Sequence, residues 1–381
     1  MSADTLPELD SLQERIVQQI EELLNKLHIG TSYTQANLVS DGSVPAKTTD
    51  ANLINPWGIG HSASSPFWVS DNGTGVTTIY DGSAKPVKIG GKAAITIATP
   101  PGQSDPASPT GQVFNEEGSG FNISQNGHTG SSVFLFATED GTISGWNPKV
   151  NAGSSVLAVD NSKGGHGAVY KGLTMADDHG TPMLYAADFH GGKVEVFDKN
   201  FHQVNAFTDP KLPEGYAPFN VQAIKGNLFV NFAQQDAAKH DDVAGAGHGF
   251  VDEFDPNGHL IARVASGGVL NSPWGLDVAP SGFGQFAGDL LVGNFGDGTI
   301  NAFDLKDDHF DGTLLGADGK PIHIGDLWAL TNGTGAVGTN PNAVYFTAGV
   351  SNEAHGLFGT LTASGGSDHS VSSMMPDLAH V

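Results

Sequence analysis

The chain has 381 residues, of which 41 are acidic and 17 basic, giving a formal net charge of −24. This balance excludes nucleic acid and anionic membranes as favoured partners, because both bind positively charged surfaces. Cysteine is absent, which excludes disulfides and thiolate metal sites, and no run of about 18 apolar residues predicts a membrane-spanning helix.

The segment Leu6–Leu27 has leucine and isoleucine at i, i+3 and i+4 spacing, which predicts an amphipathic helix. Its apolar face is expected to pack on the rest of the chain or on a second copy, so a homo-oligomer is one interpretation. A leader or export segment is the other, although no basic region followed by an apolar core indicates a signal peptide. Residues 1–32 are predicted to form a helical extension, and residues 364–381 a mobile tail.

Six stretches of the chain repeat one pattern of turn, strand, loop, strand, polar turn and strand. The repeated polar turns begin at Asp71, Glu139, Asp188, Gln234, Asn294 and Val350, at intervals of 68, 49, 46, 60 and 56 residues. Such intervals are typical of four-stranded propeller blades of about 40–50 residues that carry loop insertions. The pattern therefore predicts an all-β fold, a six-bladed β-propeller over residues 33–363.

Two further segments have predicted places in this ring. Tyr33–Ser40 reads as a strand, and we expect it to pair with the last repeat, at residues 356–362, because this pairing closes the ring and removes two sheet edges. The insertion Gln234–Gly249 is rich in charges and glycine. Long loops on compact domains are commonly functional, so we expect this one to cover one face of the propeller.

Several long motifs resemble one uncharacterised family of predicted β-propellers from bacteria and fungi, which is distantly similar to NHL-repeat proteins. The motifs begin at Asp188, Ala233, Asn294 and His355. Some exported members of this family carry a carboxy-terminal Pro-Glu-Pro sorting signal, so the resemblance implies an extracellular or periplasmic protein. This chain shows neither that signal nor a signal peptide, and a cytoplasmic location stays open. The resemblance implies no particular activity.

The loops of a propeller that open on one face form a funnel around the central channel, where ligands commonly bind. In this chain the expected funnel is rich in carboxylate and amide oxygens, which suit a divalent cation, most of all Ca²⁺. The alternative is that Asx residues only satisfy the turn backbone. The candidate metal ligands are Asp71, Glu139, Asp188, His190, Asn294 and Glu353.

Histidine offers a second interpretation of the funnel. His190, His240 and His355 could together hold Zn²⁺, Cu²⁺ or Fe²⁺. For acid–base chemistry the candidates are His240 and Asp241 on the long insertion, together with His355. The alternative for the insertion is an exposed lid whose charges keep it soluble.

Trp57 and Trp274 share the motif Pro-Trp-Gly. We expect them to pack between adjacent blades, with a stacking platform for a sugar or aromatic ligand as the alternative. Two functions follow from the funnel: a cation-dependent hydrolase of a small ester or lactone, or a non-catalytic propeller that binds a protein or a ligand. The first rests on analogy with other six-bladed propellers.

Overall fold

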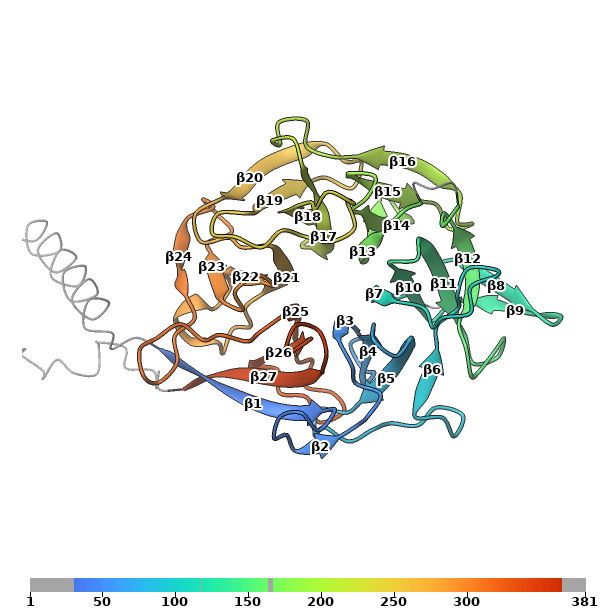
Figure 1. The fold of residues 1–381 in the computed structure, drawn as a ribbon, viewed down its shortest axis with the longest axis horizontal. Coiled ribbons are helices and arrows are strands. Elements are labelled where there is room, and N and C mark those ends of the chain that lie inside the picture. Colours follow the sequence, from blue (N-terminus) through green and yellow to red (C-terminus); the bar gives the residue numbers. More distant parts are fainter. Residues whose placement is uncertain (1–30, 117, 164–166, 365–381) are drawn as a thin grey trace, which may run out of the picture.

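The computed structural model describes residues 31–116, 118–163 and 167–364. These residues form six β-sheets arranged as blades around a central axis (Figure 1), which confirms the predicted six-bladed propeller. The helix predicted over Leu6–Leu27 lies outside the described residues, and so does the tail predicted over residues 364–381 except for Ser364, which is in a strand. Among the helices that are described, none has the length and apolar character needed to cross a membrane.

Each blade is a sheet whose strands are ordered from the axis outward (Figure 1), and the four inner strands of each blade pair antiparallel. From the inner to the outer strand, the first three blades are β3 to β6 (Pro56–Gly60, Phe67–Asp71, Val76–Tyr80, Ala94–Thr96), then β7, β10, β11 and β12 (Pro109–Phe114, Phe134–Thr138, Thr142–Trp146, Val156–Asp160), then β13 to β16 (Tyr170–Asp178, Thr181–Asp188, Lys193–Phe197, Gln203–Phe207). The fourth and fifth blades are β17 to β20 (Tyr216–Ile224, Asn227–Gln234, Phe250–Phe254, Leu260–Ser266) and β21 to β24 (Pro273–Val278, Leu290–Asn294, Ile300–Phe303, Phe310–Thr313). A hairpin, β8 and β9 (Asn122–Gln125, His128–Ser131), is inserted in the second blade, and a 3₁₀ turn, η1 (Gly284–Phe286), in the fifth.

The sixth blade combines both ends of the described chain. Its strands are β25 (Leu327–Asn332), β26 (Ala343–Ala348), β27 (Leu357–Ser364) and β1 (Ser32–Ser40), with the short β2 (Thr48–Thr49) at the edge. Strand β1 pairs antiparallel with β27, from Ser32 opposite Ser364 to Ser40 opposite Leu357. The expected strand at Tyr33–Ser40 is therefore observed, beside the last strand of the sixth repeat.

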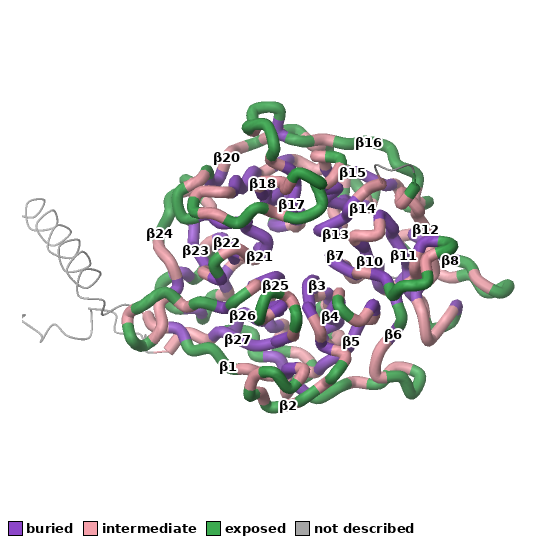
Figure 2. The backbone as a smooth tube through the Cα atoms, viewed as in Figure 1, coloured by how far each residue is buried: buried purple, intermediate pink, exposed green. Residues whose placement is uncertain are grey.

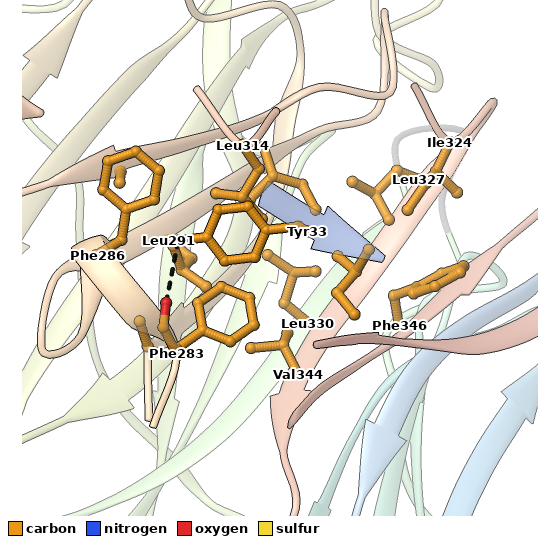
Figure 3. Packing of buried hydrophobic residues seen from close by; sticks show 14 of the residues in the cluster. Tyr33, Phe283, Phe286, Leu291, Leu314, Ile324, Leu327, Leu330, Val344 and Phe346 are labelled. Atoms are coloured by element: carbon orange, nitrogen blue, oxygen red, sulfur yellow. Dashed lines mark hydrogen bonds between the residues drawn. The ribbon is translucent and has the colours of Figure 1, made fainter. Parts of the chain in front are cut away.

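Tyr33 fastens this strand to the neighbouring fifth blade. Its ring is 2% exposed and lies among Phe283, Phe286 and Leu314 (Figure 3), and its hydroxyl donates a hydrogen bond to the carbonyl of Phe283 at 3.0 Å. Burial of a tyrosine ring removes a large apolar surface from water, and its hydroxyl needs a partner when it is buried. The N-terminal strand is thus held by its packing as well as by its hydrogen bonds.

The core lies between the blades, because each sheet is covered on both faces by its neighbours. Strands β10 and β26 are buried at every residue, whereas the outer strand β16 is mostly exposed. Figure 2 shows the same gradient, with buried inner strands and exposed peripheral loops. Strands that are buried on both faces read as continuous apolar runs, and this pattern made the repeats recognisable.

Candidate functional site

Every inner strand is interrupted by a β-bulge near its start. In five blades the pairing between the first and second strands skips one or two residues directly after the first residue of that pairing, and in the fourth blade it skips one residue after the third. A bulge re-aims the side chain that it displaces. The displaced residues, one for each blade, include Trp57, Thr110, Lys171, Phe219, Trp274 and Trp328.

The aromatic members of this set meet each other across the axis. Trp57 of the first blade stacks on Trp328 of the sixth, with ring centroids 3.4 Å apart. Trp274 of the fifth blade lies edge-on to both, at 6.1 and 5.7 Å, and Phe219 of the fourth lies 5.9 Å from Trp328. Trp57 and Trp274 therefore each pack against Trp328 of the neighbouring sixth blade, as expected, and they also contact each other although their own blades are not adjacent. They form an aromatic plug that fills the channel.

The glycine of the Pro-Trp-Gly motif is required by the distance between inner strands. A Cβ added to Gly58 would lie 2.5 Å from the carbonyl oxygen of Thr110, and one added to Gly111 would lie 2.3 Å from the backbone nitrogen of Leu173. Contacts this short do not occur for real side chains, so only glycine allows these strands to approach each other. The motif therefore marks close approach at the axis.

A second ring of side chains lies on the loops that connect the second and third strands. Each blade contributes the residue that directly follows its second strand. These residues are Asn72, Glu139, Phe189, Gln235, Phe295 and Gly349. Phe295 stacks on Trp328 with centroids 4.1 Å apart, and the side-chain amide of Asn72 donates to Oε2 of Glu139 at 2.8 Å. This second ring adds polar groups from the first and second blades beside the aromatic plug.

Lys171 is the charged residue at a bulge position, and its side chain is 2% exposed. Its ammonium donates to Oε1 of Glu139 and lies 3.3 Å from Oδ1 of Asp241, and it lies 5.0 Å from the centroid of the Trp57 ring. Burial alone would lower the pKa of Lys171, but the two carboxylates outweigh burial and hold that pKa above its usual value. The lysine is therefore an internal counter-ion between two blades and the long insertion.

Glu353 approaches the same charges from the sixth blade. Glu353 is the last of three consecutive residues in the left-handed region, with φ of 67° at Ser351 and 62° at Glu353. This conformation is costly for residues other than glycine. Asn55 donates to Oε2 of Glu353 at 2.7 Å and accepts a bond from the indole nitrogen of Trp328 at 3.0 Å. Burial raises the pKa of Glu353 to about 7.

His240 and Asp241 bring the long insertion to this site. Nδ1 of His240 lies 2.9 Å from Oδ1 of Asp241, and the backbone nitrogen of His240 donates to Asp236 at 2.8 Å. The hydrogen bond between the two side chains raises the pKa of His240 and lowers that of Asp241 to about 2, with Lys171 adding to the second effect. The His240 side chain is 48% exposed, so solvent reaches it.

These contacts define one axial network, to which five blades contribute. Its members are Asn55, Asn72, Glu139, Lys171, His240, Asp241 and Glu353. Of the predicted site residues it brings together Glu139, His240, Asp241 and Glu353. Sequence reasoning missed Lys171, whose signal was its place in Tyr-Lys-Gly, where two other blades have Pro-Trp-Gly.

Three predicted metal ligands lie inside the blades instead. Asp71, Asp188 and Asn294 are the last residues of their strands and are almost fully buried. Asp188 accepts from the backbone nitrogens of Val169 and Gly191, at 3.2 and 2.9 Å, and Asn294 bonds to Val269 and Thr299, so both satisfy local loops. Burial raises the pKa of Asp71 well above its usual value, which disfavours the anion that a metal needs.

The candidate histidines His190, His240 and His355 do not lie together in the described structure. His355 pairs with Asp41 at 2.7 Å, and His190 lies partly buried on the turn after β14. Within the described residues, two groups of three potential ligand atoms lie within 4.8 Å of one another: Glu139 with His240 and Asp241, and, on the fifth blade, Asp289 with Asp304 and Asp311. Neither group contains His190 or His355, so the structure does not assemble the three-histidine centre.

Comparisons with known proteins give relatives without an assigned activity. No family model matches the chain. An uncharacterised protein of Acanthamoeba polyphaga mimivirus is 34% identical over 331 residues, covering 85% of this chain and 78% of the relative. A second uncharacterised protein of this virus is 33% identical over 332 residues, covering 85% and 84%. These relatives are viral, so the bacterial and fungal origin implied by the sequence motifs is not supported.

Solved structures share the fold. A protein of unknown function from Bacteroides thetaiotaomicron superposes with a TM-score of 0.52 and 9% identity, covering 88% of this chain and 76% of that one. A streptogramin B lyase has a TM-score of 0.48 and 12% identity, covering 88% and 99%. At these identities the likeness concerns the NHL-like propeller alone.

Proposed function

The chain belongs to the family of the uncharacterised mimivirus proteins that match 85% of its length, and we propose that its axial network is the acid–base site of a hydrolase that cleaves a small ester or lactone. The observation that carries the proposal is that Glu353 and His240 belong to the same network. Both have pKa values raised from their usual ones, and the charges of Glu139, Lys171 and Asp241 act on both. Two titratable groups with raised pKa values in one network are suited to exchange protons with a substrate.

Each residue has a role in this proposal. Asp241 accepts the hydrogen bond of His240 at Nδ1, which leaves Nε2 as the base that takes a proton from water. The water oxygen adds to the carbonyl carbon, the bond from that carbon to the leaving oxygen breaks, and Glu353 gives that oxygen its proton. An ester yields a carboxylic acid and an alcohol, and a lactone yields a hydroxy acid.

Lys171 has a positioning role, because its buried ammonium cannot reach a substrate. It pairs with Glu139 and Asp241 and holds both side chains in place, and it helps to lower the pKa of Asp241. In this proposal the chain itself supplies a positive charge to the site.

The test is hydrolysis of p-nitrophenyl acetate and γ-butyrolactone by the full chain. Replacing Glu353→Gln or His240→Ala should lower kcat/KM at least tenfold, since general acid–base catalysis contributes about 10²–10⁴-fold. The matched controls are Glu214→Gln, at an exposed position, and His259→Ala, whose ring pairs with Asp255 at 2.9 Å on the periphery. Turnover that survives in the first two variants contradicts the proposal. Ligand binding without turnover identifies a non-catalytic binding module.

One observation favours a second candidate function, the binding of a divalent cation. Glu139, His240 and Asp241 offer three ligand atoms within 4.8 Å of one another. The Lys171 ammonium already contacts both carboxylates, so a Ca²⁺ ion has to displace it. Such a site fits the residues only when the lysine moves or loses its charge.

This competition makes the second candidate testable. If the cation site exists, Lys171→Met should bind Ca²⁺ at least tenfold more tightly than the natural chain in isothermal titration. The variant Asp311→Asn, in the other acidic cluster, is the control for binding at the fifth blade. Equal affinities of the Lys171 variant and the natural chain exclude Ca²⁺ from the axial network.

A further inference from the structure

A cavity of about 320 Å³ lies on the face of the propeller opposite to the axial network. Residues of all six inner strands line it, and in each strand they come after the bulge, whereas the axial network lies before or at the bulge. A narrower space of about 30 Å³ continues from it toward Trp274 of the aromatic plug. The cavity is thus the open end of the central channel, separated from the axial network by the plug.

The cavity wall carries hydrogen-bond acceptors without partners. The Gln112 side chain is almost fully buried, at 5% exposed, and its nitrogen donates to the carbonyls of Gly58 and Trp68, both at 2.8 Å. Its oxygen has no hydrogen-bond partner among the residues that the structure describes. Asn332 repeats this arrangement, because its nitrogen donates to the carbonyl of Val278 at 2.6 Å and its buried oxygen likewise has no partner in the described part of the chain. Unpaired buried acceptors cost free energy, so each favours a ligand that donates.

His61 adds no positive charge to this wall. Its Nδ1 lies 3.0 Å from the carbonyl of Ser62, which can only accept, so Nδ1 carries the proton. Its Nε2 lies 3.0 Å from the hydroxyl of Thr331 and accepts from it. Burial lowers the pKa of His61, which keeps the ring neutral. The proton of the Thr331 hydroxyl is used in this bond, and the lone pairs of its oxygen remain.

Asp277 is the acidic group of the cavity. One of its oxygens accepts the backbone nitrogen of Val278 at 2.7 Å, and burial raises its pKa to about 7. No lysine or arginine lines the cavity among the described residues, and none forms an ion pair with Asp277 there. A half-buried carboxylate without a counter-ion among the described residues favours a cation that brings its own charge and donors.

We propose that this cavity binds a small organic amine in its protonated form, held by Asp277, by the free oxygens of Gln112 and Asn332, and by Thr331. The volume is that of a small-molecule site, and the apolar side chains of Ile59 and Leu173 face the carbon skeleton of the ligand. The net charge of −24 attracts a cation to either face. This site does not depend on the hydrolase proposal, because it lies beyond the plug and needs no turnover.

The experiment uses matched probes on the full chain. Isothermal titration should show that 1,4-diaminobutane binds at a stoichiometry of one, and that 1,4-butanediol, of the same length but uncharged, binds at least tenfold more weakly. Asp277→Asn should lower the affinity for the diamine at least tenfold. The control Asp105→Asn, which removes the same charge from an exposed loop, should change it less than twofold.

Three results overturn the proposal. They are equal affinity for the diamine and the diol, equal effects of the two aspartate variants, and binding of calcium chloride alone that Asp277→Asn abolishes. The last identifies a metal site instead. The comparison of diamine with diol requires no variant, so it decides the matter even if Asp277→Asn does not fold.

Discussion

Replacing Lys171 with methionine removes one charge from the axial network and keeps the length of the side chain. The Glu139 side chain is 14% exposed and loses its buried counter-ion, whereas Asp241 is 67% exposed and stays solvated. Breaking a buried ion pair costs about 3–5 kcal/mol. Because one of the two partners keeps its water, we expect a loss of about 3 kcal/mol in the free energy of unfolding, at the lower end of that range.

The assay is urea denaturation at pH 7.5, followed by tryptophan fluorescence. The control is Lys163→Met, whose lysine is 77% exposed and lies 3.4 Å from Asp160, and which should cost less than about 1 kcal/mol. The double variant Lys171→Met with Glu139→Gln removes both charges, and should regain about 2 kcal/mol of the loss. The role of Lys171 as a buried counter-ion is refuted if Lys171→Met loses no more free energy of unfolding than Lys163→Met. It is also refuted if the double variant is less stable than Lys171→Met alone.

Further predictions concern catalysis and ring closure. The kcat/KM of ester hydrolysis should fall on both sides of an optimum. Glu353 loses its proton as pH rises through about 7, and His240, whose pKa is raised, becomes protonated and cannot act as a base as pH falls. Glu353→Gln should remove the decline on the alkaline side, and a profile that still falls there contradicts its role as the acid. Tyr33→Ala should destabilise the propeller by about 3–5 kcal/mol and Tyr33→Phe by about 1 kcal/mol. Thermal denaturation measures both, and an unchanged midpoint in Tyr33→Ala shows that β1 does not hold the ring.

The architecture could be predicted from the sequence because each blade buries its inner strands on both faces and therefore repeats the same apolar pattern. Buried apolar strands separated by polar turns recur six times, and the strand at Tyr33–Ser40 was recognisable because the last repeat lacked an outer strand. For the site, the sequence predicted a residue of the axial network where a carboxylate directly follows a strand, as Glu139 does.

An offset of one residue in the alignment of the turns explains why three predicted metal ligands lie inside the blades. Asp71, Asp188 and Asn294 pair with the first residues of their inner strands, and in the second blade the residue in that position is Thr138, not Glu139. A shift of one residue turns a side chain to the other side of the strand. The first three therefore lie in the blades, while Glu139 reaches the axis.

Lys171 was missed for a different reason. A lysine in a strand usually lies at a solvated face or edge, and only the bulge and the charges from two other blades make its burial favourable. Contacts between residues of distant blades are not visible in local spacing. The contact between Trp57 and Trp274 across the axis was missed for the same reason.

Acid–base chemistry in the axial network requires a carboxyl group that titrates near neutral pH, and burial raises the pKa of Glu353 to about 7. The direct measurement is a carbon-13 NMR titration of the Glu353 side-chain carboxyl carbon, assigned by its loss in Glu353→Gln. A midpoint at about pH 7, rising further when Lys171 is replaced by methionine, is the predicted result, since the ammonium favours the ionised form. A midpoint near the usual glutamate value of about 4.3, unaffected by the lysine, contradicts the claim.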